Sequence, residues 1–297
     1  MLRIVSAMGL ATTALAASCW RNSTCSGPSS ASFPGPWESN IYSPSSRLIP
    51  PVSVLSASGN VVTDYSNEES LSLTEDDSIV VLDFGVEVGG IVSLDYALSG
   101  ANATSFGLAF TEARDYIGPD SDVSRGDEGG KGGDGPLLAN ATSEGHYAMP
   151  DVNMRGGFRY LTLFLENPPS GAALNVTNVE LEISFQPTWS DLRAYGGYFH
   201  SDDELLNKIW YSGAYTVQTN SAPGSTGRGS EEPDQPEWVN DAFITEAETV
   251  LLDGAKRDRW VWIGDMGVAV PSAFVGTGDL ESTKHALLAI YDYQVGF

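Results

Sequence analysis

Residues 91–98 read IVSLDYAL, and apolar and polar side chains alternate along this stretch. Val92 and Leu94 would lie on one face of an extended chain, and Ser93 and Asp95 on the other, because successive side chains of a strand point to opposite faces. One apolar face and one polar face are typical of a half-buried antiparallel strand. This stretch therefore predicts a β-rich fold.

The same period of two recurs on both sides of this segment. SFGLAF (105–110) and VELEISF (179–185) alternate in the same way, while IVVLDF (79–84) and FRYLTLFL (158–165) are apolar on both faces and predict more deeply buried strands. Turn residues separate all of these stretches. We predict an antiparallel β-sandwich, a jelly roll, over residues 60–195.

After Tyr198 the apolar period becomes that of a helix. Ser201 and Glu204 have capping-box spacing, and they predict the start of a helix that continues to residue 220. We expect its apolar face to pack inward. That face consists of Leu205, Leu206, Ile209, Trp210 and Val217.

Three further helices are predicted. They cover residues 239–252, residues 266–276 with a kink at Pro271, and residues 279–294. The last has Asp279 as its N-cap and an inward face of Leu280, Leu287, Leu288 and Tyr291. A polar loop over residues 221–238, with Arg228, Glu231, Glu232, Asp234, Glu237 and Trp238, joins the first two helices.

The order of these elements, strands first and helices after, predicts two domains and no α/β alternation. We place the helical domain at residues 198–297. The Gly-rich stretch GDEGGKGGDG (126–135) interrupts the strand region and predicts a surface loop.

The chain has 297 residues and a formal net charge of -24. This length suffices for two domains, and the hydrophobic fraction of 41% is that of a globular protein. Strong acidity disfavours nucleic acid and anionic membrane surfaces as partners, because both would be repelled. We expect neither partner.

The first residues indicate a secretory signal peptide over residues 1–17. Arg3 precedes a short apolar stretch, and ALAA offers a cleavage site at Ala16 or Ala17. N-glycosylation sequons follow at Asn22, Asn102, Asn140 and Asn175. Together these features predict a secreted, extracellular glycoprotein from a eukaryotic secretory pathway.

Residues 18–59 are rich in Ser and Pro and predict an extended lead-in without a packed element. Cys19 and Cys25 are the two cysteines of the chain, and in an oxidising compartment they could close a small disulfide that braces little of the fold. Only three histidines are present, so a metal site is not expected. No cofactor is predicted.

Residues 253–265 read DGAKRDRWVWIGD and combine three aspartates, three basic residues and two tryptophans. Neighbouring carboxylates suit proton transfer, because burial and mutual repulsion separate their pKa values. A sugar offers hydroxyls to carboxylates and C–H faces to tryptophan, and Lys256 and Arg257 would keep the acids ionised and oriented. The composition favours a carbohydrate site, and the alternative is an exposed loop with salt bridges.

This motif resembles the catalytic motif of the α-L-rhamnosidase family, glycoside hydrolase family 78. There a loop of the form Asp-x-x-x-x-(Asp/Glu)-x-x-x-Trp-x-Gly-Asp follows the second barrel helix, and Asp253, Asp258, Trp262, Gly264 and Asp265 match it in order and spacing. The LDFG…GG…SL and GFRYLTL segments agree as well. The resemblance covers roughly residues 60–294.

The resemblance implies a fold and a set of roles. The helices would begin an (α/α)6 barrel, with the sugar at its mouth. Asp258 would be the general acid, and Asp253 and Asp265 would bind the hydroxyls of a terminal rhamnose, with Trp262 as the pocket aromatic and Arg257 beside them. The reaction would invert the anomeric centre, with a second carboxylate activating water.

Two departures from the family pattern change these expectations. Many members have Glu where this chain has Asp258, so the pocket would have to bring the shorter side chain closer to the glycosidic oxygen. The barrel has twelve helices, about four are predicted here, and the family's general base would lie beyond Phe297. We therefore expect an N-terminal fragment that is inactive by itself.

Two other functions fit the same residues. In one, the β-sandwich is a non-catalytic carbohydrate-binding module and the helical part a remnant. In the other, the protein is a related six-hairpin glycosidase that acts on another sugar, such as an uronide.

Overall fold

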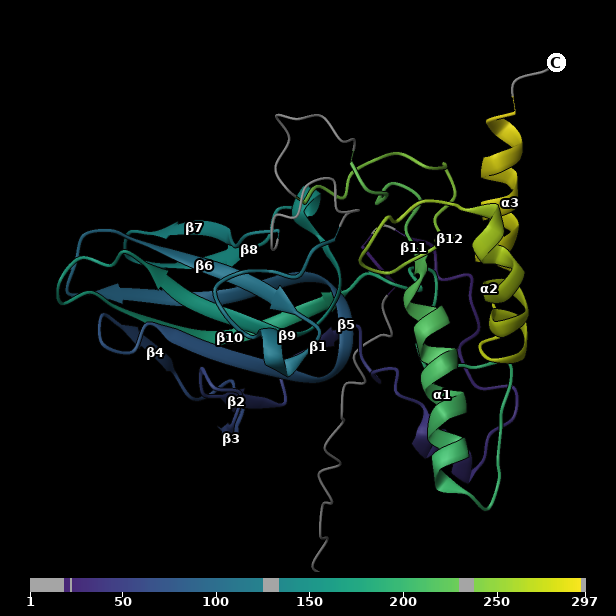
Figure 1. The fold of residues 1–297 in the computed structure, drawn as a ribbon, viewed down its shortest axis with the longest axis horizontal. Coiled ribbons are helices and arrows are strands. Elements are labelled where there is room, and N and C mark those ends of the chain that lie inside the picture. Colours follow the sequence, from purple (N-terminus) through teal and green to yellow (C-terminus); the bar gives the residue numbers. More distant parts are fainter. Residues whose placement is uncertain (1–18, 22, 125–133, 230–237, 295–297) are drawn as a thin grey trace, which may run out of the picture.

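The computed structural model describes residues 19–21, 23–124, 134–229 and 238–294. β-Strands form one end of the molecule and helices the other (Figure 1). The strands of the large sheet are β1 (Leu48–Ile49), β2 (Ser53–Leu55), β3 (Val61–Asp64), β4 (Leu71–Thr74), β5 (Ile79–Ser99), β6 (Thr104–Thr111), β7 (Leu137–Ala141), β8 (Glu144–Ala148), β9 (Arg155–Glu166) and β10 (Ala173–Ile183).

Strand β5 joins two antiparallel layers. Its first part, residues 79–83, pairs with β9, and residues 81–83 also pair with β2 on the other side. Its last part pairs with β10, and residues 93–97 also pair with β8. From β9 the first layer continues through β6 to β7, whereas β1 and β4 both pair with β10.

The segment GVEVGG, residues 85–90, lies inside β5, where the sequence predicted a turn. Gly85 and Gly90 have positive φ values of 79° and 154°, which glycine adopts readily because it has no Cβ. The pairing with β9 shifts register between Asp83 and Gly90. The glycines therefore form bulges in a continuous strand that passes from one layer to the other, and the predicted turn is wrong.

Apolar side chains of the two layers meet in one core. Leu94 of β5 and Leu181 of β10 are fully buried, as their alternation predicted. The ring of Phe106 on β6 lies 5.9 Å from that of Tyr96 on β5 and 5.5 Å from that of Tyr147 on β8, between centroids. The prediction of antiparallel strands is confirmed.

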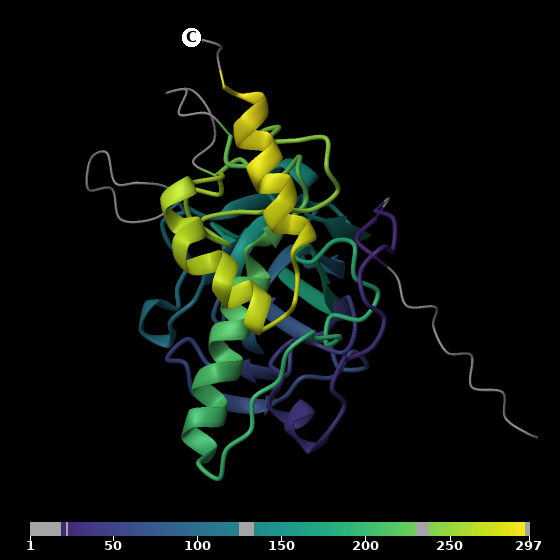
Figure 2. The ribbon, with the colours of Figure 1, turned by 90° about the vertical axis from the view of Figure 1, so that its right-hand side faces the viewer.

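Three α-helices occur in the described residues: α1 (Glu204–Thr219), α2 (Ile263–Val275) and α3 (Glu281–Asp292). They stand side by side at one end of the sheets (Figure 2). Helix α1 is capped by Asp203, whose carboxylate accepts from the backbone of Leu205 at 2.8 Å, so the predicted cap at Ser201 is two residues early. The N-cap of α3 is Leu280, one residue after the predicted Asp279, whose carboxylate nevertheless accepts from the backbone of Glu281 at 3.1 Å.

The helix predicted over residues 239–252 does not form. Its backbone pairs with an earlier loop: Ala242 forms a bridge with Gly227, and Ile244 donates to the carbonyl of Gly224 at 2.9 Å. Near its end, β12 (Val250–Leu251) pairs with β11 (Ser221–Ala222). These tertiary hydrogen bonds and the β-branched residues of the segment override its helical apolar spacing.

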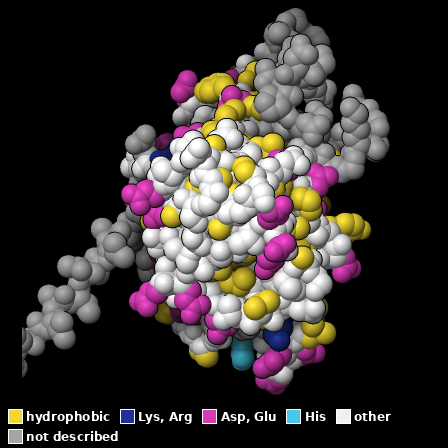
Figure 3. Space-filling view, turned by 90° about the vertical axis from the view of Figure 1, so that its left-hand side faces the viewer, with side chains coloured by type: hydrophobic (Ala, Val, Ile, Leu, Met, Phe, Trp, Pro, Cys, Tyr) yellow, Lys and Arg dark blue, Asp and Glu magenta, His cyan; other side chains and the backbone are white. Residues whose placement is uncertain are grey.

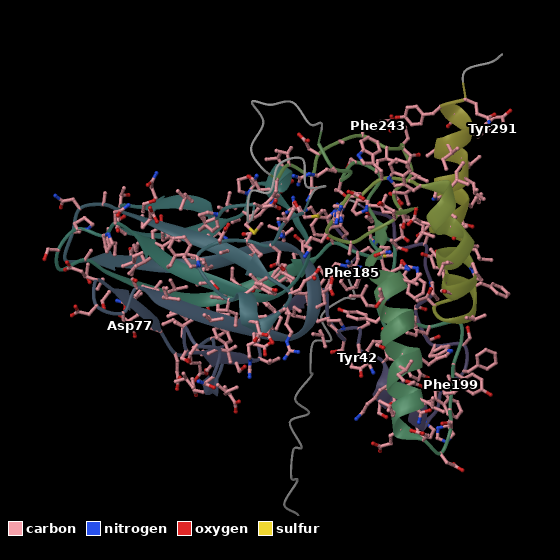
Figure 4. The ribbon with its side chains drawn as sticks, in the orientation of Figure 1. Tyr42, Asp77, Phe185, Phe199, Phe243 and Tyr291 are labelled. Carbon is pink, nitrogen blue, oxygen red and sulfur yellow. A yellow bond between two sulfur atoms is a disulfide. The ribbon has the colours of Figure 1, made fainter. Side chains whose placement is uncertain are left out.

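The helix faces predicted to pack inward are largely exposed. Leu205 of α1 is 64% exposed and Leu287 of α3 is 54% exposed, and the same holds for Leu206, Ile209, Leu280, Leu288 and Tyr291. The opposite face of α1 packs on the sheets through Tyr215, whose ring lies 5.8 Å from Phe185 and 6.5 Å from Tyr42 (Figure 4). The prediction of the buried face failed because the rest of the described chain packs against the more polar face of α1 and leaves the more apolar face exposed.

The N-terminal lead-in is packed, contrary to the prediction. The buried guanidinium of Arg47 donates to the backbone carbonyls of Ile183, Gln186 and Trp189 at 2.7–2.9 Å. The disulfide between Cys19 and Cys25 is present. The loop that this disulfide closes contains Trp20, which is buried and whose backbone N–H donates to the carbonyl of Pro187 at 2.9 Å. The disulfide loop therefore packs against the segment that follows β10.

Of the predicted sequons, Asn102 and Asn140 are exposed and Asn175 is partly buried on β10, whereas Asn22 and residues 1–18 lie outside the described residues. The face in Figure 3 carries many Asp and Glu side chains and few Lys or Arg. In the described ranges, no helix is both long and apolar enough to cross a bilayer.

Candidate functional site

The segment 253–262 forms a loop between β12 and α2 that lies against the start of β9. Contact with β9 requires glycine, because a Cβ on Gly156 would lie 1.7 Å from the carbonyl oxygen of Ala255. A Cβ on Gly157 would lie 3.3 Å from the Cβ of Lys256. The two glycines before FRYLTLFL therefore let the loop rest directly on the sheet.

Arg259 anchors this loop. It is buried, and its guanidinium donates to the carbonyl of Thr226 at 3.0 and 2.9 Å and to the carbonyl of Ala255. Asp258 and Arg259 both have left-handed φ, 61° and 48°. With Arg259 directed inward, the neighbouring side chain of Asp258 is directed outward and is 48% exposed.

Asp253 is partly buried at the base of the loop. Its carboxylate accepts from the backbone of Trp260 at 3.0 Å, and its own N–H donates to the carbonyl of Trp260 at 2.9 Å. The pKa of Asp253 is raised to about 6, chiefly by burial and also by the negative charges of Asp258 and Asp265, while the hydrogen bond from Trp260 opposes the rise. Asp253 is therefore within electrostatic range of both Asp258 and Asp265.

Trp262 and Asp265 flank the start of α2. Trp262 occupies the N-cap position and is 57% exposed, and Asp265 lies in the first turn, where the helix N-terminus favours a carboxylate. Arg257 is exposed, with its Nε 3.7 Å from a carboxylate oxygen of Asp258. The structure thus places Asp258 and Asp265 within electrostatic range of Asp253, with Trp262 at the N-cap of the helix whose first turn holds Asp265 and with Arg257 next to Asp258.

Two basic residues of the motif have structural contacts that the sequence did not assign. Besides Arg259, Lys256 forms ion pairs with Glu112 at 3.0 Å and Asp122 at 3.4 Å, both from the strand region. Nearby, burial and the charge of Glu112 raise the pKa of Glu87, while Lys256 lowers it. No sequence signal separates Arg257 from Arg259, because both are arginines next to Asp258.

A second buried charge lies where the loops meet the sheets. Arg155 pairs with Asp134 at 2.8 Å, and its guanidinium lies 4.7 Å from the centroid of the Trp238 ring. Arg228 donates to the hydroxyl of Ser124 at 2.9 Å. Arg228 and Trp238 from the predicted polar loop are thus buried, whereas Glu231, Glu232, Asp234 and Glu237 lie outside the described residues, as does most of the Gly-rich stretch.

Two cavities lie close to the motif. Trp260 and Val261 line one of about 450 Å³ together with Ile244 and the end of α3. A larger cleft of about 590 Å³ lies beyond Thr226 and contains none of the five predicted site residues.

No protein-family model and no curated protein matches this sequence. The structure is similar to that of a rhamnosidase from Klebsiella oxytoca with rhamnose bound, with a TM-score of 0.54 and 18% identity. It is also similar to a rhamnosidase of family GH78 from Bacillus sp. GL1, with a TM-score of 0.49 and 18% identity. The matches cover 81% and 74% of this chain and 42% and 18% of the two enzymes. The chain thus spans less than half the length of the first enzyme, and at this identity the likeness is one of fold.

Proposed function

We propose that this chain contributes one wall of the active site of a secreted glycoside hydrolase that removes terminal α-L-rhamnosyl, or related, residues from plant polysaccharides or glycosides. In this proposal the two β layers are a jelly roll, and α1, α2 and α3 begin an (α/α)6 barrel. The matched part of this chain corresponds to 42% of the Klebsiella enzyme, so hydrolysis by the whole protein is part of the proposal.

The observation that carries the proposal is that two acidic residues of the motif act on the partly buried carboxylate of Asp253, while an exposed tryptophan stands at the start of α2. The pKa of Asp253 responds to the charges of Asp258 and Asp265, and Trp262 is exposed between them in sequence. Carboxylates bind sugar hydroxyls, and an aromatic face packs against the C–H face of a sugar ring. The fold similarity to rhamnosidases points to the same class of ligand.

In the proposed mechanism Asp258 protonates the glycosidic oxygen as the bond to the anomeric carbon breaks. Its exposure and its outward turn make it the carboxyl that can reach a bound substrate. Asp253 and Asp265 bind hydroxyls, Trp262 packs on the ring and Arg257 orients Asp258. A separate carboxylate, which we do not assign to any described residue, activates the water on the opposite face.

The leaving group distinguishes the acid from a hydroxyl-binding carboxylate. An alkyl alkoxide must be protonated as it departs, whereas 2,4-dinitrophenolate departs without a proton. Asp258→Asn in the whole protein should therefore lose most turnover of an alkyl rhamnoside, by about 10²–10⁴-fold, and keep most turnover of 2,4-dinitrophenyl rhamnoside. Asp253→Asn, the matched variant, should lose both to the same extent.

Two results would contradict these roles. An equal loss on both substrates in Asp258→Asn would remove it as the proton donor, and selective loss in Asp253→Asn would transfer that role to Asp253. A panel of aryl glycosides, uronides included, tests the sugar specificity.

A further inference from the structure

One cavity of the described structure contains none of the predicted site residues. It is lined by Trp20, Arg21 and Ser23 and by parts of the segments 151–154, 223–226 and 240–248, and we call it the side cleft. Its volume of about 590 Å³ is within the range of small-molecule sites, about 300–1,000 Å³. Thr226 lines the cleft and accepts from Arg259, so the side cleft adjoins the motif loop.

The charges in the side cleft exclude some ligands. Asp151, Asp241, Glu246 and Glu248 line it, and Arg21 is its one basic lining residue, paired with Asp151. In the described residues, neither Asp241 nor Glu246 takes part in an ion pair or a side-chain hydrogen bond, so both acceptors are available. An anionic ligand would be repelled. The described residues contain no cluster of acidic, His or Cys side chains suited to a metal ion.

A further feature indicates a polyhydroxylated ligand. Phe243 is 53% exposed at the cleft and offers an aromatic face (Figure 4). Such a face packs against the C–H face of a sugar ring, and the available carboxylates of Asp241 and Glu246 accept from sugar hydroxyls.

We propose that the side cleft is a second carbohydrate-binding site, specific for a neutral sugar unit. The ring packs on Phe243, and its hydroxyls donate to Asp241 and Glu246. The acidic lining selects against uronic acids. The proposal shares with the proposed function the assignment of carbohydrate as ligand, but it uses different residues.

Matched pairs of sugars test both the site and its charge selectivity. Saturation-transfer NMR on the 297-residue chain would compare methyl β-D-glucoside with methyl β-D-glucuronide, and methyl β-D-galactoside with its uronide. We expect signals from at least one neutral member and weaker signals from its uronide. Phe243→Ala should weaken the neutral signal about three- to tenfold, as expected for loss of a stacked ring, while Trp262→Ala leaves it unchanged.

The controls separate this proposal from the preceding one. Phe243 is exposed, so Phe243→Ala should keep the melting temperature of the native chain. Neutral binding that is lost in Trp262→Ala and kept in Phe243→Ala overturns the second site but agrees with the motif as a sugar site. Equal signals from the neutral and the charged member of each pair, or no signal from any neutral sugar, would overturn the proposal of a sugar site in the side cleft, whatever the motif binds. Binding of L-rhamnose that depends on Trp262 tests the proposed function alone.

Discussion

The sheets and the helices of this molecule bury different kinds of side chain. In the sheets, large apolar residues such as Leu94 and Leu181 are fully buried between two layers. In the helices, Leu205 and Leu287 are exposed, and the buried positions of α1 include Asn207, Tyr211 and Gln218. The sheets are thus held by large apolar side chains. Helix α1 is held to them by the aromatic rings of Tyr211 and Tyr215 together with hydrogen bonds, such as the one from Gln218 to Leu192 at 2.7 Å, and the bond from Gln186 to Asp279 at 2.8 Å joins the start of α3.

The largest effect expected from this contrast is in the sheet core. Phe158 is fully buried, with its ring 4.8 Å from that of Phe110 and 5.6 Å from that of Phe84. Phe158→Ala should lower the free energy of unfolding by about 3–5 kcal/mol, because it removes apolar burial and leaves a cavity. Phe274→Ala, at an exposed position on α2, should change it by less than about 0.5 kcal/mol. Denaturant unfolding measures both, and similar losses would show that the helical layer is as tightly packed as the core.

The next effect concerns the two arginines that flank Asp258. Arg259→Met leaves the carbonyls of Thr226 and Ala255 without their donors, and each unsatisfied buried group costs about 1–3 kcal/mol. Arg257→Met is the matched control, since Arg257 is exposed, and it should be nearly neutral. The same denaturant titration compares them. If the two variants lose equal stability, Arg259 is not the anchor of the loop.

A smaller effect should appear in the pH dependence of stability. The pKa of Asp253 is raised from 3.8 to about 6, so the folded state holds this proton more tightly than the unfolded state does. Its contribution to the free energy of unfolding is therefore greatest at low pH and is lost as the pH rises from about 4 to about 6. Asp253→Asn should remove this decline and be relatively more stable above pH 6. Thermal unfolding of both proteins across pH 4–8 measures it, and parallel profiles would contradict the burial of this carboxyl.

The smallest effect is expected on the exposed helix face. Leu287→Gln should change the free energy of unfolding by less than about 0.5 kcal/mol, because the side chain is already mostly in water. Leu94→Gln, the same substitution in the sheet core, should be severely destabilising. A comparable loss in Leu287→Gln would show that further protein covers this face of α3 in the sample measured.

The sequence predicted the sheets better than the helices for a physical reason. A strand's alternation reports directly on its own two faces, so residues 91–98 and 179–185 were interpreted correctly. The bend at Gly85 and Gly90 was taken for a turn, because nothing local shows that a strand resumes after a bulge. Residues 239–252 have a helical apolar spacing, but their hydrogen bonds go to residues 224–229, which sequence periodicity cannot reveal.

The candidate site likewise combines residues that the sequence predicted with tertiary contacts that it could not predict. Its acids and Trp262 were predicted from composition and motif spacing, and the structure places Asp258 and Asp265 within electrostatic range of Asp253. The inward orientation of Arg259, the contact with Gly156 and the ion pairs of Lys256 depend on the sheet beneath the loop. These tertiary contacts leave no pattern in residues 253–265. The roles of the site residues remain predictions.

The most direct test of the central claim is a calorimetric titration of L-rhamnose into the native protein, Trp262→Ala and Phe274→Ala. Trp262 and Phe274 are both exposed aromatic residues, one at the start of α2 and one near its end, but only Trp262 belongs to the motif that carries the three aspartates. We predict that rhamnose binds, that Trp262→Ala weakens binding about three- to tenfold, and that Phe274→Ala leaves it unchanged. No binding, or binding unaffected by Trp262→Ala, would contradict the assignment of the Asp253–Asp265 loop as a sugar site.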